Sequence, residues 1–520
     1  MRPTQHATRM AALMILAAGL LGWLARHTEI LFADGLRYVA QAKLIDQGTW
    51  REGLVRSVDH PIYPMAIAAV HQVVGGTSPD DWQFAAQLAS ILAGVLLVIP
   101  LYLVSAELFG DETAWLACIL AFLVPITGHV FADALSESTF LLFWSWGFWA
   151  GLRFLRQGKF GWLPLSVAFG GLAYLCRPEG LLLPAALACT LLLMPLTQST
   201  RMYWPRWWAA IAFLILGPAL VAGPFVLARG GLATKPAVGR LLGLTAKSGT
   251  LAVERERPLE PDQSVAKTYA LAFRSVARAI RDAVSLPLLP LVAFGLWIAW
   301  PPRERSRLWL FVMVVEGAAF LGLMRLHATG GYCTPRHAML AVLPMFGAAA
   351  LGLSTLIRAI VIPGRWFGQP ETTFRPGPII WAMAFAAIVT MQTDGLLAPV
   401  NDRFGSYKDA GGWVSAHVPE GAKIVDVTGW SQFYSGRPGY TFADLHDARP
   451  SGSARWIVVR DAHLKGPWIY CDWLREMVAG RTPVASFPPE PVRGVAQVYI
   501  FDRETPPAQA AAVGAAPERR

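Results

Sequence analysis

The chain contains eleven apolar segments, each of a length that can cross a lipid bilayer. They lie near residues 10–26, 86–108, 113–131, 138–155, 160–176, 180–196, 207–228, 284–300, 308–325, 338–357 and 378–394. A helix that spans a bilayer needs roughly 17–25 predominantly apolar residues. Only 15% of the 520 residues are charged, whereas soluble domains carry about 25%. We therefore predict an all-α polytopic membrane protein with about eleven transmembrane helices, and we exclude a soluble enzyme, a coiled coil and a disordered chain.

The net charge of +10 does not indicate a nucleic-acid partner. Much of it comes from arginines at the ends of apolar segments, and no basic stripe or RNA-binding signature accompanies them. The five cysteines show no CxxC spacing that would indicate a metal or redox site. The sequence leaves open whether Cys176, Cys333 or Cys471 form disulfides.

The basic residues of the short loops predict the orientation in the membrane. Alternate loops carry Arg2 and Arg9, then Arg153, Arg156 and Lys159, then Arg201 and Arg206, then Arg303, Arg305 and Arg307, and finally Arg358, Arg365 and Arg375. The loop at 110–112 is an exception on this side, because it has no Lys or Arg. Short loops rich in Lys and Arg stay in the cytoplasm. Because the number of spans is odd, we expect a cytoplasmic N-terminus and an extracytoplasmic C-terminus, in the inner (plasma) membrane. The long loops 27–85 and 229–283 then lie outside.

The composition changes after residue 398. Apolar runs shorten to strand length at Lys423–Val427, Arg455–Arg460, Pro483–Phe487 and Ala496–Phe501, and helix-like stretches lie at Ala410–His417 and Trp468–Ala479. This alternation is typical of an α/β unit. We expect a transmembrane domain over 1–398, a small extracytoplasmic α/β domain over 399–505, and a disordered Ala/Pro-rich tail over 506–520.

Acidic residues lie at the predicted outer ends of the spans. Asp34 belongs to the segment FADGLRY (32–38), directly after the first span. Asp133 and Glu137 follow the third span at positions i and i+4, which share one face of a helix. Acids this close to hydrocarbon are costly and are candidate functional residues. The alternative is helix capping, which stabilises a helix by about 0.5–2 kcal/mol.

Histidine, tyrosine and arginine side chains lie on the same predicted face. They occur in DHPIYP (59–64), in the charged break CRPEG (176–180) and in GGYCTPRH (330–337). Prolines are ordinary at helix starts, and a single arginine can extend to the membrane interface. As a set, however, guanidinium groups suit phosphate and carboxylates suit proton abstraction from a hydroxyl. The constellation predicts transfer chemistry on a phosphate-bearing substrate at the outer leaflet.

These motifs, in this order, resemble those of the GT-C membrane glycosyltransferases. The resemblance rests on DGLRY (34–38), HPIYP (60–64), the Ser136-Glu137 start of the fourth span and RPEG (177–180), and it covers about residues 10–360. The similar branch contains protein O-mannosyltransferases and aminoarabinose lipid A transferases. The resemblance implies a polyprenyl-phosphate sugar as donor, and an acceptor hydroxyl on a glycan, lipid or protein. Neither the sugar nor the acceptor follows from the sequence.

The same resemblance implies roles for individual residues. Asp34 would act as general base on the acceptor, and Asp133 or Glu137 would be the second acidic position. Arg336, with Arg177, would stabilise charge on the departing phosphate. The further candidates for substrate binding are Tyr38, His60, Tyr63, Glu179, Tyr332 and His337. Because the first loop has one acid at 34–35 where many relatives have adjacent acids, no essential metal and no other cofactor are expected.

Two other classes of protein share part of this pattern. A transporter or lipid flippase would have the same apolar bulk, and intramembrane charges would mark its pathway. The long outer loops, the lack of repeated halves and the α/β segment argue against it. An O-antigen ligase or polymerase also uses outer arginines and a polyprenyl carrier, but its motifs come in a different order.

Overall fold

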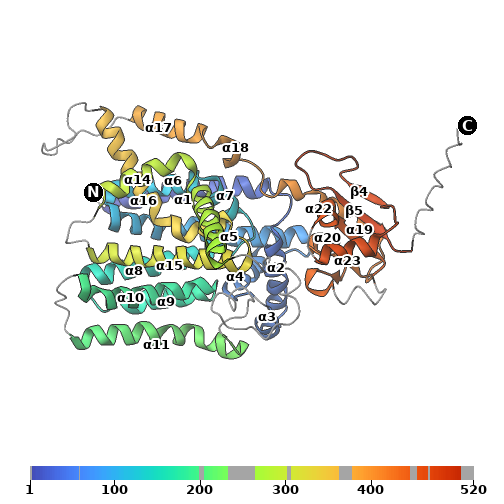
Figure 1. The fold of residues 1–520 in the computed structure, drawn as a ribbon, viewed down its shortest axis with the longest axis horizontal. Helices are drawn as coiled ribbons and strands as arrows, with labels where there is room; N and C mark the ends of the chain where they lie inside the picture. Colours follow the sequence, from blue (N-terminus) through green and yellow to red (C-terminus); the bar gives the residue numbers. More distant parts are fainter. Residues whose placement is uncertain are drawn as a thin grey trace, which may run out of the picture.

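The computed structural model describes residues 3–57, 59–197, 204–231, 264–300, 306–361, 378–445, 454–466 and 469–504. These residues form a bundle of helices with a small sheet region at one end (Figure 1). The helices of the bundle are α1 (Pro3–Arg26), α2 (Ala33–Asp46), α3 (Trp50–Arg56), α4 (Ile62–Val74), α5 (Pro79–Phe109), α6 (Asp111–Leu123), α7 (Pro125–Ala132), α8 (Glu137–Gln157), α9 (Trp162–Tyr174), η1 (Pro178–Leu181), α10 (Leu182–Thr197), α11 (Trp204–Arg229), α13 (Val265–Val284), η2 (Leu286–Leu288), α14 (Leu289–Ile298), α15 (Ser306–Gly330), α16 (Pro335–Val361), α17 (Pro378–Thr390) and α18 (Thr393–Leu396).

Every predicted span contains a helix, which confirms the prediction of a helical membrane protein. Among the described residues, six segments are long and apolar enough to cross a membrane alone, namely α1, α5, η1 with α10, α11, α15 and α16. The bent pairs α6–α7 and α13–α14 raise this number to eight if each is one span. Helices α9 and α17 have only 13 residues each, fewer than the roughly 17 that a span requires. The count of eleven therefore stays a prediction.

Local sequence explains the two bends. Helices α6 and α7 meet at 72°, where Pro125 lacks the N–H that would continue the first helix. Helices α13 and α14 meet at 86°, next to Ser285, whose φ of 74° is incompatible with a helix. The sequence analysis assigns residues 229–283 to a long outer loop, whereas the structure has helix α13 over Val265–Val284. Its alanines and valines nevertheless recur at helical spacing, and Ala272, Val276, Ala279 and Ala283 are buried.

Lipid-facing surfaces account for the exposed apolar side chains of the bundle. Ile15 on α1, Leu220 on α11 and Trp297 on α14 are each more than 70% exposed. In water, apolar surface of this extent would be unfavourable, whereas hydrocarbon solvates it without cost. The opposite faces of the same helices pack into the core, as for Leu21 and Leu24 of α1. The bundle therefore has the surface of a membrane protein.

The C-terminal sheet region, residues 399–504, has a mixed five-stranded sheet. Its elements are η4 (Asp402–Phe404), α19 (Ser406–His417), β1 (Ile424–Asp426), α20 (Trp430–Ser435), β2 (Gly439–Tyr440), η5 (Phe442–Asp444), β3 (Trp456–Arg460), α22 (Asp461–Lys465), α23 (Ile469–Val478), β4 (Ala485–Phe487) and β5 (Val498–Asp502). The strand order is β2-β1-β3-β5-β4, with β2, β1 and β3 parallel and β5 antiparallel to both neighbours. The predicted α/β character is confirmed. Strand β2 was not predicted, because two residues carry no alternation, and the tail 506–520 lies outside the described residues.

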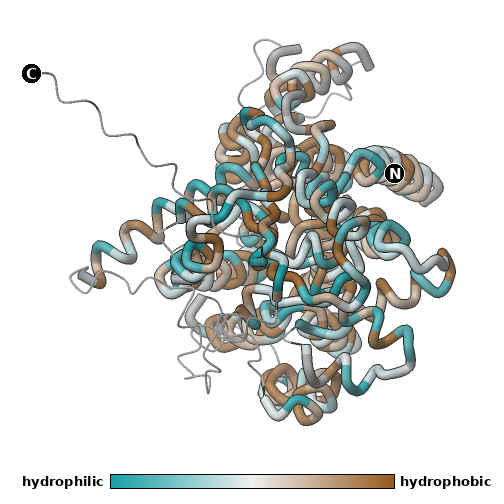
Figure 2. Tube along the Cα trace, turned by 90° about the vertical axis from the view of Figure 1, so that its right-hand side faces the viewer, coloured by the Kyte–Doolittle hydropathy of each residue, from teal (hydrophilic) through white to brown (hydrophobic). Residues whose placement is uncertain are grey.

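The sheet region packs against the end of the bundle where α2 and α4 begin. Helix α20 lies beside α2 and α5 in Figure 1. Lys408 of α19 forms an ion pair with Asp80 at the start of α5, with 2.6 Å between Nζ and Oδ1. Seen from this side, hydrophilic and apolar stretches alternate along the chain (Figure 2). The C-terminal region therefore contacts the connection between α1 and α2, directly before Asp34.

Candidate active site

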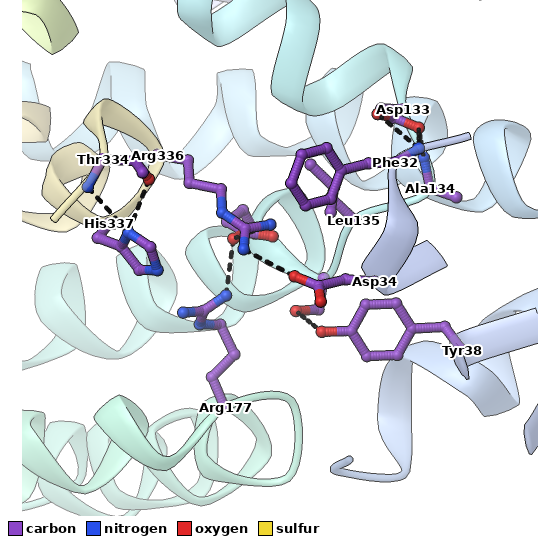
Figure 3. A network of polar contacts seen from close by, with 12 residues as sticks. Phe32, Asp34, Tyr38, Asp133, Ala134, Leu135, Arg177, Thr334, Arg336 and His337 are labelled. Carbon is purple, nitrogen blue, oxygen red and sulfur yellow. Dashed lines mark hydrogen bonds and ion pairs between the residues drawn. The ribbon is translucent and has the colours of Figure 1, made fainter. Parts of the chain in front are cut away.

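The carboxylate of Asp34 pairs with two arginines. Helix α2 has Phe32 as its N-cap, so Asp34 lies in the first turn, where the helix dipole favours a negative charge. Its Oδ2 accepts a hydrogen bond of 2.7 Å from Nη2 of Arg336, and its Oδ1 lies 3.1 Å from Nη2 of Arg37. Asp34 and Arg336 are 302 positions apart in the chain. Figure 3 shows the two side chains pointing toward each other from α2 and α16.

Gly35 permits the close packing that brings Asp34 into this position. A Cβ at residue 35 would lie 2.8 Å from the Cβ of Ala134 and 2.9 Å from its carbonyl oxygen. Such contacts do not occur between real atoms, so only glycine lets α2 approach the connection between α7 and α8 this closely. The Asp-Gly pair of the sequence motif thus has a steric reason. It places the start of α2 beside the start of α8.

Glu137, the first residue of α8, is shared between Arg336 and a further arginine, Arg177. Its Oε1 accepts a hydrogen bond of 2.7 Å from Nη1 of Arg177 and lies 3.9 Å from Nη1 of Arg336. Arg177 also donates to Glu179 at 2.9 Å. Because Glu137 is buried, its charge is tolerated only through such pairing. Acidic and basic groups therefore alternate in a continuous cluster.

The Arg-Pro-Glu-Gly break supplies Arg177 to this cluster for local reasons. A residue before proline avoids the helical region, and Arg177 is extended at φ −153° and ψ 145°. Helix α9 therefore ends, and the arginine side chain turns toward Glu137. A Cβ on Gly180 would collide with the backbone of Tyr174, so glycine is also required to fold η1 back onto α9.

Arg37 and Asp59 belong to the cluster but were not among the predicted site residues. Nε of Arg37 donates to Oδ2 of Asp59 at 3.0 Å, and Asp59 is completely buried. Asp34 and Arg37 are three positions apart on one helix, and this spacing is a sequence signal for an ion pair between them. With them, three arginines face four carboxylates, which come from α2, α8, η1 and α16 and from the residues just before α4 and η1.

The predicted aromatic and histidine residues surround the cluster at different distances. Tyr38 Oη lies 3.1 Å from Ser136 Oγ, next to Glu137. Tyr63 is fully buried and donates to the Ala86 carbonyl at 3.0 Å, so it packs α4 against α5. His60 is buried with its ring centroid 5.0 Å from that of Tyr174. Tyr63 and His60 therefore support the cluster through packing, whereas Tyr38 lies directly beside it.

Tyr332 and His337 flank Arg336 on the other side. The two rings are 5.7 Å apart between centroids, and Tyr332 is exposed. Nδ1 of His337 lies 2.7 Å from Oγ1 of Thr334, which holds the imidazole at the start of α16 (Figure 3). The guanidinium of Arg336 itself lies 4.6 Å from the centre of the Phe32 ring, a favourable cation–π geometry.

Asp133 has different partners from Glu137, the other candidate for the second acidic position. Its two carboxylate oxygens accept hydrogen bonds from the backbone N–H of Phe32 at 3.1 and 3.2 Å and of Ala134 at 2.7 Å, and from Nδ2 of Asn401 at 2.7 Å. Figure 3 shows the carboxylate turned toward the Phe32 backbone. The geometry therefore favours Glu137 as the acid of the cluster, and gives Asp133 the task of holding the loop before Asp34.

Burial raises the pKa of Asp133 to about 6, so we expect a pH-dependent contribution to stability. The folded protein then holds a proton that the unfolded chain, with an aspartate pKa of about 3.9, has released. The contribution is present below about pH 4 and is lost as the pH rises through about 6, with a size on the order of 3 kcal/mol. Thermal unfolding of the parent and of Asp133→Asn between pH 4 and 7 measures it. Identical pH slopes for the two proteins would contradict the assignment.

The chain that carries this cluster is similar to known proteins. Residues 59–221 match the family model of dolichyl-phosphate-mannose-protein mannosyltransferases. The comparison with curated protein sequences gives no significant match. Among solved structures, ArnT from Cupriavidus metallidurans bound to undecaprenyl phosphate is similar over 96% of this chain and 98% of its own, with 13% identity and a TM-score of 0.59.

The structure of an archaeal enzyme is also similar to this chain. The oligosaccharyltransferase AglB from Archaeoglobus fulgidus, in complex with an inhibitory peptide and a dolichol-phosphate, is similar over 90% of this chain and 71% of its own. Its identity is 12% and its TM-score is 0.54. At these identities the likeness concerns the fold. The chain thus has the GT-C fold of membrane glycosyltransferases.

Proposed function

We propose that this protein is an integral-membrane glycosyltransferase, which moves a sugar from a polyprenyl-phosphate donor to an acceptor hydroxyl. The observation that carries the proposal is the contact between Asp34 and Arg336, beside Glu137 and Arg177, at one end of the bundle. A base and a pair of phosphate-binding groups lie within one cluster. The family model and the undecaprenyl phosphate and dolichol-phosphate bound to the similar structures support this reading.

In the proposed reaction, Asp34 takes the proton of the acceptor hydroxyl. The acceptor oxygen attacks the anomeric carbon on the side opposite the phosphate, and the bond from that carbon to the phosphate oxygen breaks. The configuration at the anomeric carbon is therefore inverted. Polyprenyl phosphate departs with the bonding electrons. Arg336 and Arg177 stabilise the charge that develops on it, because preorganised cations interact most strongly with the transition state.

The contacts of Asp34 suggest an order of binding. Its carboxylate pairs with Arg336 and Arg37. An incoming donor phosphate offers these guanidiniums a second anionic partner and loosens their hold on Asp34. We therefore propose that the donor binds first and that Asp34 then becomes available to the acceptor.

The remaining features of the proposal concern the sugar, the acceptor and the location. The sugar is a hexose or pentose, and the acceptor is a glycan, a lipid or a protein of the cell envelope. Residues 1–398 form the transmembrane domain and 399–505 an extracytoplasmic domain. The N-terminus is cytoplasmic, the active site faces away from the cytoplasm, and the membrane is the inner (plasma) membrane, as the alternation of basic loops predicts.

Purified protein in detergent, incubated with a panel of labelled polyprenyl-phosphate sugars, provides the test. We expect release of polyprenyl phosphate that depends on an acceptor extract. Movement of an intact donor across reconstituted vesicles without bond cleavage would favour a transporter or flippase. Turnover of polyprenyl-diphosphate donors alone would favour an O-antigen ligase or polymerase.

A further inference from the structure

Side chains of the C-terminal sheet region hold the backbone of residues 30–32, the turn between α1 and α2. Oη of Tyr434 accepts a hydrogen bond of 3.1 Å from the N–H of Leu31. Nε1 of Trp430 donates to the carbonyl of the same residue at 2.7 Å. Nδ2 of Asn401 donates to the carbonyl of Ile30 at 3.2 Å. Ile30 and Leu31 are fully buried, so water cannot replace these partners.

The same side chains are tied to the bundle through their second hydrogen-bonding positions. The Tyr434 hydroxyl donates to Oε1 of Gln83 at 2.6 Å, and Gln83 in turn donates to the carbonyl of Thr28 at 3.0 Å. The second hydrogen of the Asn401 amide goes to Asp133 at 2.7 Å. A hydroxyl that accepts once and donates once, and an amide nitrogen that donates twice, match the roles that these groups allow. A network of this kind specifies one position of the turn.

The turn controls where Asp34 lies. Phe32 is the N-cap of α2, and its carbonyl accepts from the N–H of Gly35 at 2.8 Å, so the first helical turn moves with it. The Phe32 ring also lies against the guanidinium of Arg336. A displacement of residues 30–32 would therefore change the distance between Asp34 and Arg336.

We infer that the C-terminal sheet region positions Asp34, and that Asn401, Trp430 and Tyr434 are positioning residues for the transfer reaction. The inference rests on the proposed function for the role of Asp34. The sheet region then contributes to catalysis indirectly, because it holds the turn before Asp34. The three positioning residues lie outside the sequence motifs. None of the three residues contacts Arg336, Glu137 or Arg177 by any bond described in the structure.

Tyr434→Phe tests the inference with the smallest change. It removes one hydroxyl, leaves the ring packed, and deprives both Leu31 and Gln83 of a partner. We expect kcat to fall by roughly 10-fold, because a small misplacement of a reacting group is costly in rate. The KM for the donor should stay within about twofold of the parent value, since the phosphate-binding arginines are unchanged.

Tyr499→Phe is the matched control. Tyr499 lies on β5 of the same region, and its ring packs beside Phe501 in the cluster around Leu474 rather than against the turn. It should leave kcat unchanged. Equal kcat values for Tyr434→Phe and the parent would overturn the inference, as would a Tyr434→Phe defect that appears only as a raised donor KM.

Hydrogen exchange gives a readout that does not require turnover. The backbone amides of residues 28–34 should exchange faster in Tyr434→Phe and at the parent rate in Tyr499→Phe. Unchanged exchange in this segment, or faster exchange throughout the chain, would overturn the positioning role. If the parent releases no polyprenyl phosphate from any donor, the proposed function fails, and the exchange result alone decides whether the sheet region holds the turn.

Discussion

Asp34→Asn is expected to reduce the release of polyprenyl phosphate by about 10²–10⁴-fold, the usual contribution of a general base. Asparagine has nearly the same shape and still accepts a hydrogen bond from Arg336, but its amide cannot take a proton. Arg336 retains Glu137, and Arg37 retains Asp59. The unfolding temperature should therefore change little. Initial rates at saturating donor, together with thermal unfolding in the same detergent, measure both quantities.

Asp80→Asn is a suitable control for this substitution. Asp80 also lies in the first turn of a helix and also pairs with a basic side chain, Lys408, but it is exposed and outside the cluster. We expect its rate to equal that of the parent. If Asp34→Asn retained activity within a few-fold of the parent, Asp34 would be a partner of the arginines and not the base.

Arg336→Lys is expected to lower kcat by about 10²-fold or more, the cost of removing one preorganised group that stabilises transition-state charge. Arg336 reaches Asp34 and Glu137 with different nitrogens of one planar group and lies over the Phe32 ring. Lysine offers a point charge on a flexible stem and cannot reproduce this geometry. The KM for the donor should rise as well, because the same contacts bind its phosphate. A donor titration in matched detergent measures both parameters.

Two further variants make this result specific. Arg325→Lys is the control, since Arg325 on α15 is exposed and donates only outside the cluster, to Tyr269 at 3.2 Å. Arg177→Lys tests the neighbouring guanidinium. Parent-like kinetics for Arg336→Lys would remove that residue from the site, and a selective defect in Arg177→Lys would assign the phosphate contact to Arg177.

Local patterns in the sequence were sufficient for the elements, and they named most of the residues that the structure brings together in the cluster. Each apolar segment contains a helix, since burial in lipid requires every backbone group to be bonded within its own segment. The four predicted strands are present, because their apolar runs are short and bounded by turn residues. Asp34, Glu137, Arg177, Glu179 and Arg336, which belong to separate motifs, lie in one cluster.

The pattern was insufficient where a partner came from a distant part of the chain. Sequence could not separate Asp133 from Glu137, because their spacing of four predicts one shared helix face. That expectation was wrong: Asp133 is extended after the end of α7, Glu137 begins α8, and only the packing of Asn401 and Phe32 engages Asp133. It also missed Arg37 and Asp59, and it did not connect Tyr434 with the turn before α2.

The physical reason is the range of each interaction. Hydrophobic periodicity, proline and glycine act over a few residues, so the sequence by itself determined the helices, the strands and the arginine-bearing break at 176–180. The contact between Asp34 and Arg336 spans 302 positions and depends on how α2, α8 and α16 pack, including the close approach at Gly35. Only the tertiary structure decided which acids and bases meet, because these pairings come from packing and not from neighbouring residues.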